Sequence, residues 1–202
     1  MTPQSGVIVG DRRSPNLAAL MKYQPVFPAA LQPAALALLR AMAASERSPA
    51  YQGFRVLVQG EVLSAPARLY CLPDVLRSII KETTGDSRTL ALCLGTRHWG
   101  GYVREECLRQ LVSTDRPWVA PFIVQLLGEH VVEIVEVIAA AMPEANAASL
   151  SDFARENPEF MAITRQRATS YWDCYYRRRF PSLQTYPAIT VLKAIDAMAQ
   201  SG

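Results

Sequence analysis

Apolar residues recur at helical spacing along most of the chain. The run PAALALLRAMAA, which begins at Pro33, is rich in strong helix formers. From Leu72 the run LPDVLRSIIKE places apolar residues on one helical face, with Asp74 in the first turn. Four further striped segments follow with short breaks between them: SRTLALCLGTRHW, GGYVREECLRQLV, PWVAPFIVQLLG and EHVVEIVEVIAAAM. Such short connections predict helices that pack antiparallel or at a steep angle to their neighbours.

One segment has the period of a strand instead. Between Phe54 and Cys71, apolar positions alternate and the pair Gln59-Gly60 interrupts the alternation. This pattern predicts a β-hairpin. Pro66 is expected at an edge or a bulge, because proline cannot donate a hydrogen bond to a β-ladder.

The C-terminal third returns to helical spacing. Ser151-Asp152 is suited to capping a helix after the small-polar stretch PEANAASLS, and a longer helix is predicted from Pro158. One face of that longer helix carries Phe160, Ile163, Arg167, Tyr171, Cys174 and Arg178, and this face is expected to be its buried stripe. A last helix from Pro187 is expected to close the open end of the helix stack.

Together these patterns predict a mostly α protein of stacked antiparallel helix pairs with one small β-hairpin near 54–71. Residues 1–15 lack periodicity and are predicted to be a flexible N-terminal tail. Residues 16–202 are predicted to form a single helical-repeat domain, with a repeat core over 72–142 and C-terminal helices over 151–200.

The repeat core shows internal similarity. Leu72, Leu76 and Ile80 recur 31 residues later as Val103, Cys107 and Leu111, and again as Ile134, Ile138 and Met142. The intervening segments match at 33 residues: Leu90 with Ile123, Leu94 with Leu127, and Gly95 with Gly128. This periodicity predicts one helix pair used repeatedly, each pair burying its apolar stripe on the next.

The segment GYVREECLRQLV, followed by a turn and WVAPFIVQLLG, resembles a HEAT repeat, an α-solenoid unit. Val103, Arg104, Cys107 and Leu111 carry the pattern of its second helix. The resemblance is best over 101–128 and weaker over 72–142, with a period shorter than the roughly 40–47 residues of that repeat. It implies a curved helical stack of a kind that binds proteins and, in some related arrays, DNA.

Composition indicates the class and compartment of the protein. Half of the 202 residues are apolar and the mean hydropathy is +0.06, which excludes global disorder. No apolar run approaches the ~18 residues of a membrane span, and MTPQSGVIVG does not resemble a signal peptide. The four cysteines lack paired spacing. These features predict a cytoplasmic protein with free thiols and no membrane association.

The sequence contains no motif for catalysis, metal binding or a cofactor. It has no P-loop, G-x-G-x-x-G, H-E-x-x-H or G-x-S-x-G. Cys93, His98 and Cys107 form C-x4-H-x8-C, which is not a zinc spacing, so buried thiols are the favoured interpretation. Glu129, Glu133 and Glu136 are favoured as a solvated face or as partners for arginines. We therefore expect no enzymatic activity, no cofactor and no small-molecule ligand.

The turn over 96–102 is the first candidate binding site. Arg97, Trp99 and Tyr102 surround two glycines and are candidate anchors for a partner. The alternative is structural: the rings of Trp99 and Tyr102 fill the interface between repeats, and Arg104 pairs inside the chain with Glu105 or with neighbours of Glu106 on the adjacent helix.

The second candidate is the segment YWDCYYRRR, within which Trp172, Arg177 and Arg179 are candidate partner-binding residues. Between Phe153 and Phe180 the sequence has six arginines and three acidic residues. This local excess equals the whole net charge of +3. The structural alternative packs Tyr171, Cys174 and Tyr175 on the repeats. The favoured hypothesis is a non-enzymatic scaffold that presents its helical surface to a protein; the alternative is nucleic-acid binding through the helix over 165–179.

Overall fold

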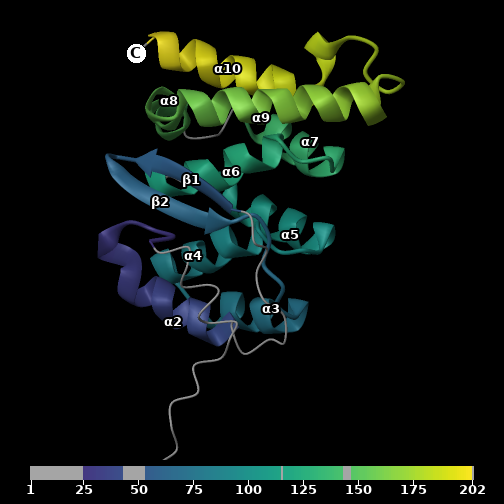
Figure 1. Ribbon diagram of the computed structural model, residues 1–202. Coiled ribbons are helices and arrows are strands. Elements are labelled where there is room, and N and C mark those ends of the chain that lie inside the picture. Colours follow the sequence, from purple (N-terminus) through teal and green to yellow (C-terminus); the bar gives the residue numbers. More distant parts are fainter. Residues whose placement is uncertain (1–24, 43–52, 115, 143–146, 202) are drawn as a thin grey trace, which may run out of the picture.

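The computed structural model describes residues 25–42, 53–114, 116–142 and 147–201, and it is mostly helical with one small two-stranded antiparallel sheet (Figure 1). The predicted fold class is confirmed. Residues 1–15, predicted to be a tail, lie outside the described ranges. The elements are α2 (Gln32–Met42), β1 (Gly53–Val58), β2 (Glu61–Pro66), α3 (Pro73–Glu82), α4 (Gly85–Gly95), α5 (Gly101–Leu111), α6 (Ala120–Leu127), α7 (Val132–Ala141), α8 (Ala147–Glu156), α9 (Pro158–Tyr171) and α10 (Pro187–Ser201).

The central helices form a stack in which α3, α5 and α7 lie one above another in Figure 1. Arg77 of α3 pairs with Glu106 of α5 at 2.9 Å across one level of this stack. At Gly95 the end of α4 is so close to α5 that an added Cβ would collide with the Cys107 thiol. Only glycine fits there, because any side chain would push the two helices apart. Helix α10 packs against α7, α8 and α9 and covers the upper end of the stack in that view.

The predicted hairpin is present, and its ladder runs from Val58 opposite Glu61 to Gly53 opposite Pro66. Gln59 and Gly60 form the two-residue loop with φ of 52° and 79°. Two consecutive residues of positive φ match the right-handed twist of the flanking strands. Pro66 stands at the last rung of the ladder, which is a position that proline tolerates.

A chain of aromatic rings attaches the hairpin to the helices. Phe54 of β1 lies 6.1 Å from Phe122 of α6 and 5.6 Å from Phe160 of α9, measured between ring centroids. Phe27 stacks on Phe122 at 5.3 Å and meets Trp118 edge-on at 5.6 Å. Because these rings come from four separate segments, burying them fixes the hairpin between α6 and α9.

Two predicted boundaries change in the C-terminal helices. Helix α8 begins at Ala147, so Ser151 and Asp152 lie inside it and do not cap its N-terminus. Ser151 Oγ instead donates to the carbonyl of Ala148, one turn back. Helix α10 extends to Ser201. The polar residues that suggested a helix start are therefore tolerated within the helix, because their side chains bond locally or face water.

The predicted buried face of α9 is also corrected. The side chains that α9 buries are Met161, Thr164 and Ala168, one position away from the predicted stripe. A π-helical turn over Trp172–Tyr176 follows, and its wider turn keeps Trp172 and Tyr176 packed against the core. Three residues of the predicted stripe, Phe160, Ile163 and Arg167, line a groove instead.

Candidate functional site: the groove between β1 and α9

The predicted turn site divides into a buried half and an exposed half. Arg97 and His98 are both fully buried, with 0% of their surface exposed. The backbone fixes them, because Leu69 N–H donates to Arg97 O at 2.7 Å and Trp99 N–H donates to Leu69 O at 3.0 Å. Arg97 therefore cannot contact the surface of a macromolecular partner, contrary to the expectation for an anchor residue.

The aromatic residues of the same turn do face outward. Trp99 is 52% exposed and Tyr102 is 89% exposed, so neither fills an interface between helices. Arg104 lies beneath them and donates to the carbonyls of His98 and Trp99, both at 3.0 Å. Its guanidinium also pairs with Glu129 at 3.2 Å. The structural alternative expected an intrachain partner for Arg104, but it named Glu105 or neighbours of Glu106 and not Glu129.

The residues of the second predicted site are held by their neighbours. Trp172 is half-buried, and its indole N–H donates to the carbonyl of Phe180 at 2.8 Å. Arg177 lies over the Trp172 ring at 5.0 Å and pairs with Asp173. Arg179 pairs with Glu136 of α7 at 2.6 Å. Cys174 and Tyr175, which the structural alternative packs on the repeats, are exposed instead.

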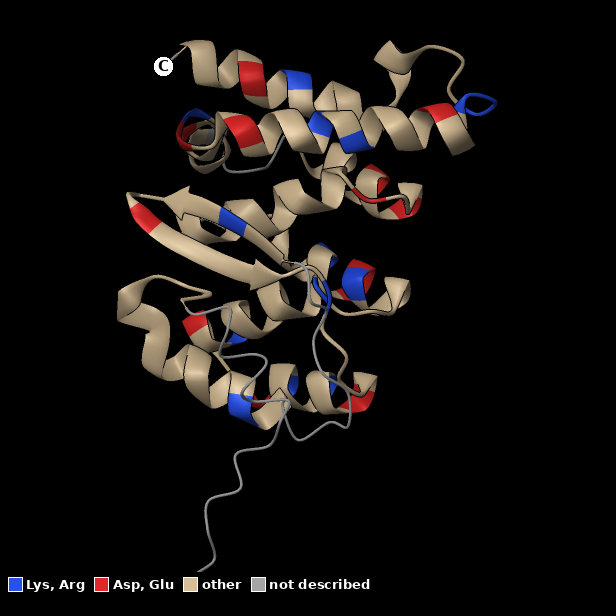
Figure 2. Cartoon of the chain, viewed as in Figure 1, with Lys and Arg blue, Asp and Glu red and all other residues tan. Residues whose placement is uncertain are grey.

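The two predicted sites do not form one surface, because α7 lies between α5 and the end of α9 in Figure 1. Figure 2 shows acidic residues interspersed with basic ones along α8, α9 and the turn that follows. Four of the six arginines in this region pair with carboxylates: Arg155 with Asp152, Arg165 with Asp196, Arg177 with Asp173 and Arg179 with Glu136. The local basic excess is largely neutralised in the folded chain.

A different feature, the outer edge of β1, was not predicted. Leu57 N–H donates to Asn157 Oδ1, and Asn157 Nδ2 donates to Leu57 O, both at 2.7 Å. Glu156 accepts from the main-chain N–H groups of Gln59 and Gly60 at 2.9 and 3.0 Å. The junction of α8 and α9 thus occupies the loop end of this edge, as a neighbouring strand would.

The remainder of the edge is open. Outward-facing main-chain groups recur every second residue in an antiparallel strand, so Arg55 directs its N–H and C=O the same way as Leu57. Across the described part of the chain, these two groups of Arg55 have no partner. The outer edge of β2 differs, since Ser64 N–H donates to Pro25 O at 2.8 Å.

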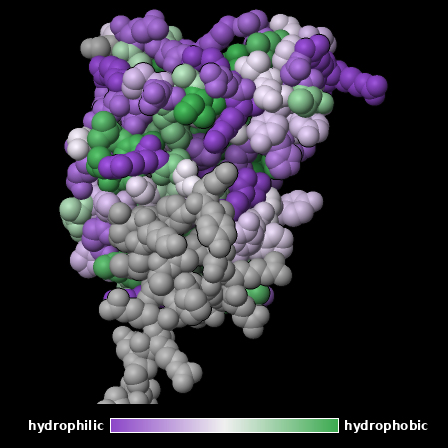
Figure 3. Space-filling model, viewed as in Figure 1, coloured by the Kyte–Doolittle hydropathy of each residue, from purple (hydrophilic) through white to green (hydrophobic). Residues whose placement is uncertain are grey.

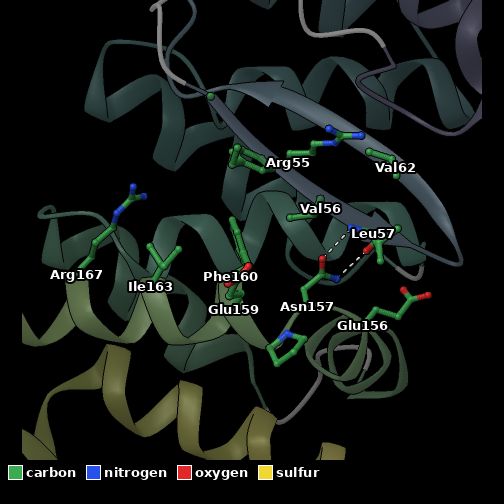
Figure 4. A pocket seen from close by; sticks show the side chains of 13 residues that line it. Arg55, Val56, Leu57, Val62, Glu156, Asn157, Glu159, Phe160, Ile163 and Arg167 are labelled. Carbon is green, nitrogen blue, oxygen red and sulfur yellow. Dashed lines mark hydrogen bonds between the residues drawn. The ribbon is translucent and has the colours of Figure 1, made fainter.

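This open edge borders a groove of about 560 Å³ between β1 and α9. Figure 4 shows Phe160, Ile163 and Arg167 rising from α9 towards the strand, with Asn157 bonded to Leu57 at one end. Ile163 and Leu57 are two of the few large apolar residues exposed among those described. Figure 3 shows apolar surface gathered at the level of the hairpin and α9, with hydrophilic side chains crossing it. The groove therefore combines apolar walls with unpaired main-chain groups.

A second, more polar cavity of about 910 Å³ adjoins the groove. Gly53 and Arg167 line both spaces, so the cavity lies at the Gly53 end of β1, away from Asn157. Its other lining residues are Ala67, Arg68, Tyr70, Gln125, Gly128, Glu129, His130 and Tyr171.

Beneath this cavity three arginines surround one carboxylate. Glu129 Oε1 pairs with Arg68 at 2.8 Å and with Arg97 at 3.2 Å, and Glu129 Oε2 pairs with Arg104 at 3.2 Å. We call these four residues the Glu129 cluster. Glu129 lies in the loop after α6, whereas the arginines come from the loop before α3, the α4–α5 turn and α5. The cluster therefore joins three separate parts of the stack.

Burial dominates the electrostatics of the cluster. Loss of hydration lowers the pKa of Arg97 to about 10 and lowers that of Arg104, while the Glu129 carboxylate opposes both shifts. Both guanidiniums remain protonated at neutral pH. Three positive charges thus face one negative charge in a largely water-excluded region.

His98 and Cys93 do not form a base and nucleophile. His98 Nε2 contacts Cys71 O and His98 Nδ1 accepts from Gly100 N–H, both at 2.9 Å, so both ring nitrogens are occupied. Burial raises the pKa of the Cys93 thiol well above its ordinary value. A buried neutral thiol without an available base is not an activated nucleophile.

Comparison with protein-family models, with curated protein sequences and with solved structures finds no match. Within the described ranges, no three His, Cys, Asp or Glu side chains are arranged to hold a metal ion. No described helix combines the length and apolarity needed to cross a bilayer.

Proposed function

We propose that this protein is a non-catalytic interaction protein that binds an extended segment of a protein partner as an added strand along β1. The observation that carries this proposal is the open edge at Arg55 beside an apolar groove. A strand added to a sheet edge gains affinity from main-chain hydrogen bonds, and side-chain pockets beside the edge supply specificity. The unpaired main-chain groups of Arg55 and the apolar groove lie along the same stretch of β1.

The shape of the groove favours an extended segment over a helix. One wall is a strand edge, and the other is the α9 face that carries Phe160 and Ile163. The volume of 560 Å³ lies within the roughly 300–1,000 Å³ of ligand pockets and suits a few residues of a chain. An extended segment directs alternate side chains towards α9 while its backbone pairs with Arg55.

Charge supports a protein segment over a nucleic acid. The arginines that line the groove are Arg55 and Arg167, and neither makes an ion pair with a described residue. Two such cations offer too few phosphate contacts for a nucleic-acid surface. Most arginines on the proposed nucleic-acid helix are already paired within the chain. The four free cysteines fit a reducing compartment, and we place the interaction in the cytoplasm.

A peptide selection tests the proposal directly. The full chain is used to select binders from a library of ten-residue linear peptides displayed with free C termini. Binding of a selected peptide is then measured by fluorescence anisotropy for wild type, Arg55→Pro and Arg55→Ala. Proline removes the outward N–H without removing a ladder bond to β2, whereas alanine keeps that N–H and removes only the side chain.

Strand addition predicts that Arg55→Pro weakens binding at least tenfold and that Arg55→Ala has a much smaller effect. Hydrogen exchange should show that the Arg55 amide becomes protected when the peptide binds. Equal affinity of all three proteins, or protection confined to the Trp99–Tyr102 turn, would move the site away from β1. Binding of a random single-stranded 20-mer that weakens steeply with salt would favour the nucleic-acid alternative.

A further inference from the structure

The polar cavity beside Arg68 adjoins the groove, shares Gly53 and Arg167 with it and differs from it in charge. The groove proper is lined mainly by β1 and by the apolar face of α9. The cavity places Arg68 and Arg167 on its walls, and Glu129 at its wall connects it to the buried Arg97 and Arg104. One site therefore has an apolar end and a cationic end.

The Glu129 cluster does not satisfy its own arginines. Arg97 Nη1 lies 3.2 Å from Glu129 but is not aligned for a hydrogen bond, and Arg97 Nη2 has no partner in the described structure. Glu129, 4% exposed, leaves its Oε2 without a hydrogen bond as well. Buried charged groups are ordinarily paired and hydrogen-bonded, so an excess of two positive charges favours an additional anion near the cluster. Arg97 and Arg104 are buried and line neither space, so the arginines that an anion in the cavity could contact are Arg68 and Arg167.

The direction of the added strand determines which part of the segment reaches the cavity. An antiparallel strand beside β1 runs from the Leu57 end towards the Gly53 end, so its C-terminal side leads into the cavity. Each strand residue advances ~3.3 Å, so two or three residues separate the position opposite Arg55 from the cavity.

We infer that this cavity binds a carboxylate carried by the partner segment on the C-terminal side of the residues that pair with β1. The inference rests on the proposed strand addition, with the added strand antiparallel to β1. Arg68 and Arg167 both line the cavity, and a carboxylate accepts two parallel N–H bonds from a guanidinium. Arg68 already pairs with one carboxylate, that of Glu129. The carboxylate belongs either to an acidic side chain or to the chain terminus of the partner.

The test uses four versions of one selected peptide, with its acidic residue kept or replaced by its amide and with its C terminus free or amidated. Each version is measured against wild type, Arg167→Gln and Arg178→Gln. Arg167 is exposed and pairs with no described residue, so its loss leaves the fold intact. Arg178 is an equally exposed arginine that lines neither cavity, which makes it the matched control.

We expect that removing either the acidic side chain or the C-terminal carboxylate of the peptide weakens binding to wild type at least tenfold. The one whose removal has this effect is the carboxylate that the cavity binds. Arg167→Gln should weaken the intact peptide similarly and should leave the peptide without that carboxylate almost unchanged, while Arg178→Gln changes neither. If Arg55→Pro still abolishes binding but neither carboxylate matters, the strand proposal stands and this inference fails. Tighter binding of a phosphoserine version than of the acidic version would also overturn the carboxylate assignment.

Discussion

Asn157 binds both main-chain polar groups of Leu57, one hundred residues earlier in the chain, with two hydrogen bonds of 2.7 Å. A single side chain thereby reproduces the pairing of a neighbouring strand and ends the open edge of β1. Asn157 Nδ2 also donates to Phe153 O at 2.9 Å, which fixes the amide relative to α8. The attachment of the hairpin to the α8–α9 junction therefore depends strongly on one residue.

Replacing Asn157 with alanine should destabilise the fold. Three hydrogen bonds at a buried position are lost, and each contributes about 0.5–1.5 kcal/mol. We expect the free energy of unfolding to fall by about 2–3 kcal/mol in urea titrations. Gln166→Ala, at an exposed position of α9, is the control and should change it by less than ~0.5 kcal/mol. A loss for Asn157→Ala no larger than that of the control would contradict the role of Asn157.

Removing the Glu129 carboxylate should be more damaging. Glu129→Ala leaves Arg97 and Arg104 buried without a counter-charge, for which a loss of about 3–5 kcal/mol is expected. The measurement is chemical denaturation at neutral pH, with Glu133→Ala, at an exposed position on α7, as the control. Adding Arg97→Met to Glu129→Ala should recover part of the loss, because one uncompensated charge is then absent. Stability of Glu129→Ala equal to that of the control would show that the cluster contributes nothing.

His98 should make stability depend on pH. Burial lowers the pKa of His98 below its ordinary 6.5, and protonation of Nδ1 would break its bond from Gly100 N–H. The unfolded chain therefore binds the proton more readily, so this contribution is complete above pH ~6.5 and is lost as pH falls towards the folded pKa. Its slope is at most about 1.4 kcal/mol per pH unit.

The measurement compares urea denaturation of wild type and His98→Gln at several pH values between 7.5 and 5. Wild-type stability should decline over this window, and the variant should lack that part of the decline. Parallel pH profiles of the two proteins would exclude His98 as the titrating group.

The four cysteines should differ sharply in reactivity. Cys174 is exposed, whereas Cys71, Cys93 and Cys107 are buried. Burial raises the pKa of Cys71 to about 11 and that of Cys107 to about 12, so these thiols carry almost no thiolate at neutral pH. A thiol reagent such as Ellman's reagent should modify one cysteine in the native protein and four after denaturation. Rapid native modification of Cys174→Ser would contradict this assignment.

Local patterns predicted the elements well, since they depend on residues close in sequence. The alternation around Val56 and Val58 with Gln59-Gly60 between two apolar stretches was sufficient for the hairpin, and proline positions marked the starts of α3, α9 and α10. The similarity at 31 residues relates residues at or beside α3, α5 and α7. Whether this stack is a HEAT-like repeat stays a prediction.

The candidate site was missed because its contacts are long-range. Nothing near Arg97 in the sequence indicates Glu129 as its partner, and Asn157 preceding Pro158 suggests a helix start rather than a bond to Leu57. One signal was available: the stripe Phe160, Ile163, Arg167 and Tyr171 was recognised as a face. Its interpretation as a buried face was wrong, because the adjacent face carries the small residues Thr164 and Ala168 that permit close packing.

The direction in which the arginines after Tyr176 point depends on the number of residues in the π-helical turn over Trp172–Tyr176. A π-helical turn contains one more residue between its hydrogen-bonded groups than an α-helical turn does. In an α-helix, one residue corresponds to ~100° of rotation about the helix axis. Deleting a single residue here would restore an ordinary helix and swing Arg179 away from Glu136 without altering any side chain of the pair. The orientation of this end of the molecule is therefore sensitive to insertions and deletions in a way that substitutions alone would not reveal.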